Sequence, residues 1–94
     1  MATSKIRKTN RIIVIAQNPS FSVAALSWTT IALTPPTSQA PANASLIAIT
    51  ASTPRSSGCD CCVEETNGSY GVHIKNNYNA AATGSMLVRW IYAV

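Results

Sequence analysis

Charged residues are scarce in this sequence. Asp, Glu, Lys and Arg make up 11% of its 94 residues, whereas a typical soluble domain has about 25%. Hydrophobic residues make up 47%, so the chain lacks the low hydrophobicity and high charge density of intrinsic disorder. We expect small uncharged side chains to form much of the polar surface, because 21 residues are Ser or Thr and seven are Asn. We expect one small folded domain, since this length excludes a multidomain enzyme.

Long apolar runs are also missing. The run Ile12 to Ala16 ends after five residues at Gln17. A secretory signal needs an apolar region of about 7 to 15 residues, and a membrane helix needs about 18. We therefore expect no cleavable signal peptide and no membrane span.

Groups for catalysis or cofactor binding are few. His73 is the only histidine, and the three acidic residues, Asp60, Glu64 and Glu65, lie in one short stretch. Glu64 and Glu65 are adjacent, so in a strand they point to opposite faces and cannot act on one substrate. The four glycines do not form a phosphate-binding loop. We expect a protein that is not an enzyme, with no catalytic residues and no cofactor.

Three cysteines, Cys59, Cys61 and Cys62, lie close together in the sequence. With His73 they would supply the four ligands of a tetrahedral zinc site. Paired cysteines in such sites are usually separated by about two to four residues, and the tighter spacing here leads us to expect no metal. The alternatives are buried thiols or a disulfide among Cys59, Cys61 and Cys62. The odd count leaves one thiol for a bridge between subunits.

Positive charge is concentrated at the N-terminus. The net charge is +4. Lys5, Arg7, Lys8 and Arg11 account for it, because the other basic residues and the acidic residues cancel. We divide the chain into a basic arm, residues 1–11, and a single β-sandwich domain, residues 12–94. We expect the arm to dock on a neighbouring copy or another structural protein. Four cations with no aromatic residue among them do not predict nucleic-acid binding.

Short strands are the elements that the residue pattern predicts. The segment 21–33 is too long for one strand and changes phase, which indicates a bulge or tight turn at 24–27. Five to seven strands separated by turn signals predict an all-β fold, a small antiparallel β-sandwich of jelly-roll type. Besides that segment, the clearest strands are expected at residues 11–17, 45–51, 70–76 and 86–94.

Turn residues separate these strands. The proline-rich residues 34–41 predict a surface loop, and Asn67-Gly68 predicts a hairpin tip. Thr83-Gly84-Ser85 is a turn signal. We expect the cysteines to lie on a loop that leads into a strand at Val63. Both faces of 45–51 are largely apolar, which predicts a strand that is central or covered on both sides.

The last predicted strand has two apolar faces. One face carries Met86, Val88, Trp90, Tyr92 and Val94, and the other carries Leu87, Arg89, Ile91 and Ala93. A domain of this size has one core, so only one face lines it. We expect Leu87, Arg89 and Ile91 to form an interface that another copy or its donated strand covers. The alternative is that the chain's own loops cover this face.

Aromatic and amide side chains suggest one binding alternative. Aromatic rings stack on sugars and amides hydrogen-bond their hydroxyls, so a glycan would contact Tyr70, His73, Asn76, Asn77 and Tyr78. The competing interpretation is an ordinary solvated face.

Residues 70–77 and 83–94 resemble the final two strands of small β-sandwich modules in bacteriophage fibres, head decorations and related lectin-like domains. In those modules a hydrophobic strand, an asparagine loop and a strand ending in aromatic-Ile-x-Ala/Val close the sheet. The resemblance implies a role on a virion or fibre surface, with no catalytic residues. The cysteine segment is not part of this pattern.

We therefore expect a non-enzymatic structural subunit that self-assembles on a virion or fibre surface, as a capsid decoration or a fibre or tail component. One alternative is a glycan-binding, lectin-like module. Another is an extracellular appendage subunit locked by disulfides. The expected partners are copies of the chain itself, and the expected location is a virion or extracellular surface.

Overall fold

The chain is all-β in a computed structural model that describes residues 11–94. All strand pairs are antiparallel. This confirms the all-β, antiparallel part of the predicted fold, and the arrangement is compatible with a β-sandwich. The elements in this range are β1 (Ile12–Gln17), β2 (Ser20–Val23), β3 (Trp28–Leu33), β4 (Ser45–Ser52), the 3-10 turn η1 (Arg55–Ser57), β5 (Cys59–Thr66), β6 (Ser69–Asn76), β7 (Ala82–Ser85) and β8 (Leu87–Ala93).

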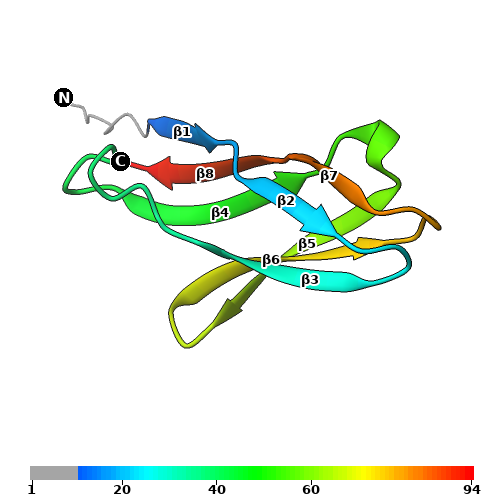
Figure 1. Cartoon of the computed structure of the whole chain (residues 1–94). Helices are drawn as coiled ribbons and strands as arrows, with labels where there is room; N and C mark the ends of the chain where they lie inside the picture. The colour runs from blue at the N-terminus through cyan, green and yellow to red at the C-terminus, as the bar shows by residue number, and fades with distance from the viewer. Residues whose placement is uncertain (1–10) are drawn as a thin grey trace, which may run out of the picture.

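The strands form two three-stranded sheets and one two-stranded ribbon. The sheets have the orders β1-β8-β4 and β3-β6-β5, and the ribbon pairs β2 with β7. Figure 1 shows the first sheet above the second, with β2 crossing in front toward β3. The last strand, β8, is therefore the central strand of its sheet.

One interrupted ladder joins the first two strands to the last two. β1 pairs with β8 from Ile12↔Ala93 onward, and the same register continues as β2 pairs with β7. The two parts meet at Pro19, which has no N–H to donate to a ladder. Its carbonyl still accepts a bond of 2.9 Å from the backbone N–H of Met86. The proline thus divides a single long strand pair without shifting its register.

The core lies between the sheets and under the ribbon. β8 contributes most to it, because its inward face is fully or almost fully buried, as the alternation in the sequence predicted. Trp90 is the largest buried side chain; its indole N–H donates to Oε1 of Gln17 at 2.7 Å, and its ring meets Tyr70 edge-on. The buried apolar residues are Phe21, Val23, Leu33, Val72, Ile74, Ala82, Met86, Val88, Trp90 and Tyr92.

Two predicted turns are confirmed. Asn67 and Gly68 have φ values of 51° and 82° and connect the paired residues Thr66 and Ser69. These positive φ angles match the right-handed twist of a two-residue hairpin. A tight turn also separates β2 from β3, where the N–H of Ser27 donates to the carbonyl of Ala24 at 3.2 Å.

Several local predictions were wrong. The cysteines lie within β5 rather than on a preceding loop, and Thr83-Gly84-Ser85 belongs to β7 rather than to a turn. In both places, pairing with a distant strand holds the backbone extended. The strands number eight in residues 11–94, because the turn at 24–27 and the break at Pro19 each divide a segment.

β4 also differs from its prediction. It is an edge strand, and within residues 11–94 its one sheet partner is β8. A bulge between Leu46 and Ala48 shifts the register by one residue. Leu46 and Ile49 therefore face inward together, while Ile47 is exposed. A bulge adds an unpaired residue, so from Ala48 onward the side chains point to the opposite faces from those that simple alternation from Leu46 would give.

Asn76 is a fully buried polar residue that holds two turns together. Its Nδ2 donates to the carbonyl oxygens of Ala80 at 2.8 Å, Ala24 at 3.2 Å and Val23 at 3.3 Å. Its Oδ1 accepts a bond of 2.9 Å from the backbone N–H of Tyr78. The amide thus connects the end of β2 to the loop between β6 and β7.

Asn76→Ala should lower the free energy of unfolding by roughly 3 kcal/mol, because it leaves several buried backbone groups without a partner. The matched control is Asn77→Ala, which removes one exposed bond to Asp60 and should change stability by less than about 1 kcal/mol. Urea denaturation followed by tryptophan fluorescence measures both. Equal losses in the two variants would contradict the structural role of Asn76.

Candidate functional site

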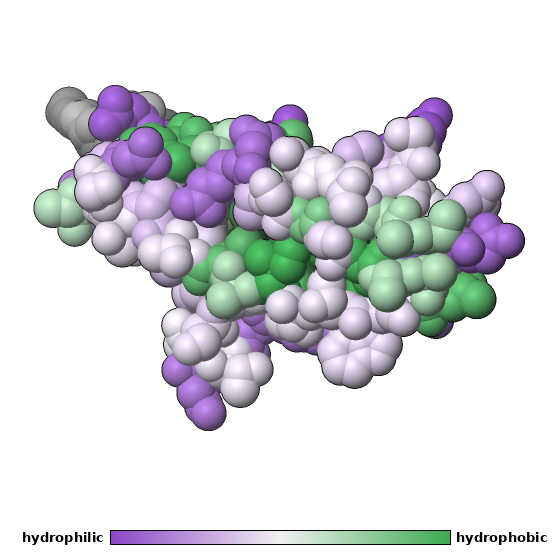
Figure 2. All heavy atoms as spheres, viewed as in Figure 1, coloured by the Kyte–Doolittle hydropathy of each residue, from purple (hydrophilic) through white to green (hydrophobic). Residues whose placement is uncertain are grey.

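The outer face of the β1-β8-β4 sheet is apolar. In register across it, Val14 of β1 and Ala48 of β4 flank Ile91 of β8. Ile12 is 57% exposed and Val14 is 52% exposed. Figure 2 shows hydrophobic atoms gathered over β1, at the upper left. We call this surface the apolar face; it consists of Ile12, Val14, Ala16, Ala48, Thr50, Leu87, Arg89, Ile91 and Ala93.

The three predicted interface residues lie together on the apolar face. Leu87 and Ile91 are half-buried, and Arg89 between them is exposed. Arg89 pairs in register with Ala16 on one side and Thr50 on the other. Within residues 11–94 no acidic residue belongs to this face, so it combines one cation with aliphatic neighbours. The role of Leu87, Arg89 and Ile91 as an interface stays a prediction.

Most of the predicted basic arm cannot be placed. Lys5, Arg7 and Lys8 lie outside the described residues 11–94. Arg11 is exposed, and its carbonyl accepts a bond of 3.0 Å from the N–H of Val94. The described chain therefore starts beside the C-terminal end of β8.

The outer face of the β3-β6-β5 sheet carries polar and aromatic groups. Trp28 is 64% exposed and stacks on His73, with ring centroids 4.9 Å apart and planes inclined by 29°. Nδ1 of His73 lies 3.7 Å from Oε2 of Glu64. Cys62 pairs with His73 in the β5-β6 register. Sequence reasoning did not select Trp28, because the pairing of β3 with β6 brings it to His73.

The cysteines are divided between the two faces of β5. Cys59 and Cys61 are half-buried and pack against the core, whereas Cys62 is exposed. All three thiols are free. Cys59, Cys61, Cys62 and His73 do not converge as a zinc site would require. In the part of the chain that the structure describes, no three His, Cys, Asp or Glu side chains are grouped to hold a metal ion.

Burial raises the pKa of the Cys61 thiol above its ordinary value, with a further contribution from the neighbouring Cys62. Its Sγ lies 3.5 Å from the carbonyl oxygen of Ala51 on β4, a hydrogen-bonding distance for a thiol donor. Cys61 is therefore held as a neutral thiol between β4 and β5 over a wider pH range than a free cysteine.

The residues proposed for a glycan site do not share one surface. His73 is on the outer face, while Tyr70 packs inward against Trp90. Asn77 donates to Oδ2 of Asp60 at 2.8 Å, and Tyr78 is exposed on the loop after β6. Asn76 is fully buried, so it cannot contact a glycan. Its side chain points inward, where it donates hydrogen bonds to the carbonyl oxygens of Val23 and Ala80.

A groove opens between β4 and the β5-β6 hairpin, with a volume of about 420 Å³. Figure 1 shows the hairpin tip turning away from β4 at the lower left. The sequence did not predict this groove, because it depends on how the two sheets diverge. Its lining includes Leu46, Ile47, Ile49, Val63, Glu65 and Tyr70.

Iodoacetamide should alkylate Cys62 of the folded protein before Cys61. The reason is that Cys62 is exposed, whereas Cys61 is half-buried with a raised pKa, so its thiolate forms only at higher pH. Mass spectrometry of peptides from a time course at neutral pH measures the order. In urea the difference in alkylation rate between Cys62 and Cys61 should disappear, because the chain is unfolded. Equal rates in the folded protein would contradict the division of the thiols between two faces.

Comparison with known proteins returned no match for this chain, whether to a family model, a curated protein or a solved structure. Among residues 11–94, no helix has the length and apolar content that crossing a membrane takes.

Proposed function

We propose that the protein is a non-enzymatic structural subunit that self-assembles through the apolar face. The observation that carries the proposal is the exposure of Ile12 and Val14 beside Ile91, on a sheet face that no other described element covers. A contiguous exposed apolar surface marks a site of association. A second copy would remove it from water.

The scarcity of charge supports association between copies. Burying a charged side chain at an interface is costly, whereas Ala, Thr and aliphatic groups lose little when water leaves. Arg89 is the one charged residue of the apolar face. Two copies would pack with an offset, because direct apposition would bring the two arginines together.

The proposal includes a jelly-roll-like sandwich with an extended basic arm. Nested pairing supports the jelly-roll description, since β1 and β2 pair with β8 and β7, and β3 pairs with β6 inside them. The charges of residues 5–11 support an arm that docks on a neighbour. The resemblance of the C-terminal strands to phage modules supports a virion or fibre surface as the setting, in a capsid decoration or a fibre or tail component.

Val14→Asp should lower the mass of the wild-type assemblies by removing the apolar-face contact, because it places a carboxylate in the middle of that contact. Val14 is 52% exposed, so the free energy of unfolding should fall by less than about 1 kcal/mol. Light scattering measures the mass. Thr30→Asp, an equivalent change on the outer face of the other sheet, is the control and should still assemble. A wild-type chain that stays monomeric at all concentrations would refute self-assembly.

Glycan binding is a second candidate function, and the Trp28–His73 pair supports it. An exposed tryptophan on a flat sheet offers an apolar ring face for a sugar, and Glu64 beside His73 supplies a hydrogen-bond acceptor. This site differs from the one predicted, since it retains His73 but not Asn76 or Tyr70.

Trp28→Ala should abolish binding on a glycan array under this second function, whereas Tyr78→Ala should not, because Tyr78 lies on the loop after β6 rather than on the Trp28–His73 platform. Both side chains are exposed, at 64% and 61%, so both variants should fold. An array without signal for the wild-type protein removes this candidate.

A further inference from the structure

We propose that the groove between β4 and the β5-β6 hairpin receives the basic arm, residues 1–11, of a second copy. The inference rests on the proposed self-assembly and names a second contact for it. The apolar face and the groove share only Ala48 of β4, so one copy can use both.

The groove offers the surface of an unpaired strand. β4 forms one of its walls, and within residues 11–94 its outer edge has no sheet partner. An edge strand presents N–H and C=O groups on which an extended segment can pair. Leu46, Val63 and Tyr70 contribute apolar side chains to a lining that is more polar than apolar. An incoming strand would find both backbone partners and side-chain contacts.

Charge complementarity identifies the occupant. The three acidic residues of the chain, Asp60, Glu64 and Glu65, all lie on β5. Glu65 lines the groove, and Glu64 borders it with its carboxylate beside His73 on the outer face. Four of the seven basic residues lie in the arm, and Arg55, Lys75 and Arg89 are the others. The arm therefore has the highest local concentration of positive charge in the sequence, and β5, at the wall of the groove, has the highest concentration of negative charge.

The arm also fits the groove in its residue pattern. In an extended segment successive side chains alternate in direction. Lys5 and Arg7 then share one side, with Ile6 and Lys8 on the other. The arm thus brings cations for Glu65 together with an apolar side chain for the lining.

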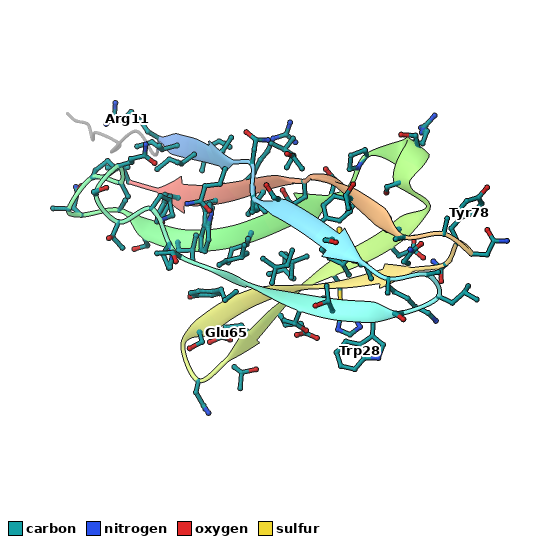
Figure 3. All side chains as sticks on the ribbon, in the orientation of Figure 1. Arg11, Trp28, Glu65 and Tyr78 are labelled. Carbon is teal, nitrogen blue, oxygen red and sulfur yellow. The ribbon has the colours of Figure 1, made fainter. Side chains whose placement is uncertain are left out.

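The position of Arg11, where the described chain starts, favours entry of the arm into the groove of a second copy rather than into the groove of its own copy. β1 and β4 occupy opposite edges of their sheet, with β8 between them. Figure 3 shows Arg11 beside β1 and Glu65 on the hairpin, with β8 and β4 between them. An arm folded onto its own groove would have to reverse and cross the end of β8. An arm that enters a neighbour links copies head to tail, which gives an open assembly.

Two full-length variants test the proposal by complementation. The first carries Lys5→Gln, Arg7→Gln and Lys8→Gln, which neutralise the arm but leave the groove. The second carries Glu65→Lys, which leaves the arm but repels it from the groove. Each alone should lose head-to-tail association by roughly tenfold or more, because the first removes three cations and the second replaces an attracting carboxylate with a repelling ammonium. Mixed together, they should form a heterodimer of twice the 9.9 kDa chain mass, seen by light scattering in a Val14→Asp background.

Asp60→Lys is the matched control. Asp60 and Glu65 lie on the same strand, and each accepts one hydrogen bond. Asp60 accepts it from Nδ2 of Asn77, and Glu65 accepts it from the N–H of Gly68. The two substitutions change the net charge equally, but Asp60 does not line the groove. The Asp60→Lys variant should retain head-to-tail association. For the chain with an unmodified groove, 0.5 M NaCl should weaken this association, because salt screens exposed charge pairs between the arm and the groove.

The outcomes separate this inference from the proposed function. If the wild-type chain assembles while the arm and groove variants assemble equally well, the apolar face stands and the groove proposal fails. If Asp60→Lys loses as much association as Glu65→Lys, net charge rather than the groove is responsible, and the proposal also fails. If neither variant associates alone and their mixture forms no heterodimer, the arm does not enter a second copy. Thermal denaturation confirms that each variant is folded.

Discussion

The ladder between the first and last strands is the constraint on which the rest of the structure depends. β1 and β8 hold residues 12–17 and 88–93 together, and the same register carries the chain through Pro19 into β2 and β7. Because proline cannot donate, the ladder breaks there and its second half brings Phe21 and Val23 into the core. Both sheets then pack on one set of buried residues. β8 becomes central, and its second face is left at the surface.

The outer faces of the two three-stranded sheets differ in chemistry. The face of β1, β8 and β4 is aliphatic around Arg89, whereas the face of β3, β6 and β5 presents Trp28, His73 and carboxylates. Apolar area drives association without direction, and charge pairs give direction and partner choice. A subunit that associates through the apolar face and aligns through its basic arm would use both.

The residue pattern predicted much of the fold but little of the site. Alternation placed Val88, Trp90 and Tyr92 inside and Leu87, Arg89 and Ile91 outside, since a strand has only two faces. Asn67-Gly68 predicted its hairpin because few other residues adopt positive φ. The bulge after Leu46 escaped prediction, as did the burial of Asn76. The bulge depends on the pairing of β4 with β8, and the burial of Asn76 depends on its hydrogen bonds to Val23 and Ala24; in both cases the partner is distant in the sequence.

The sequence by itself determined the strand class, the side-chain alternation, the tight turns and the separation of a basic N-terminus from a neutral body. These are local properties, set by backbone preferences and by the order of residues. Tertiary structure alone decided which strands are neighbours. It brought Trp28 onto His73, divided the cysteines between two faces and opened the groove beside β4. Those features arise from contacts between distant segments, whose pairing follows from the packing of the whole core.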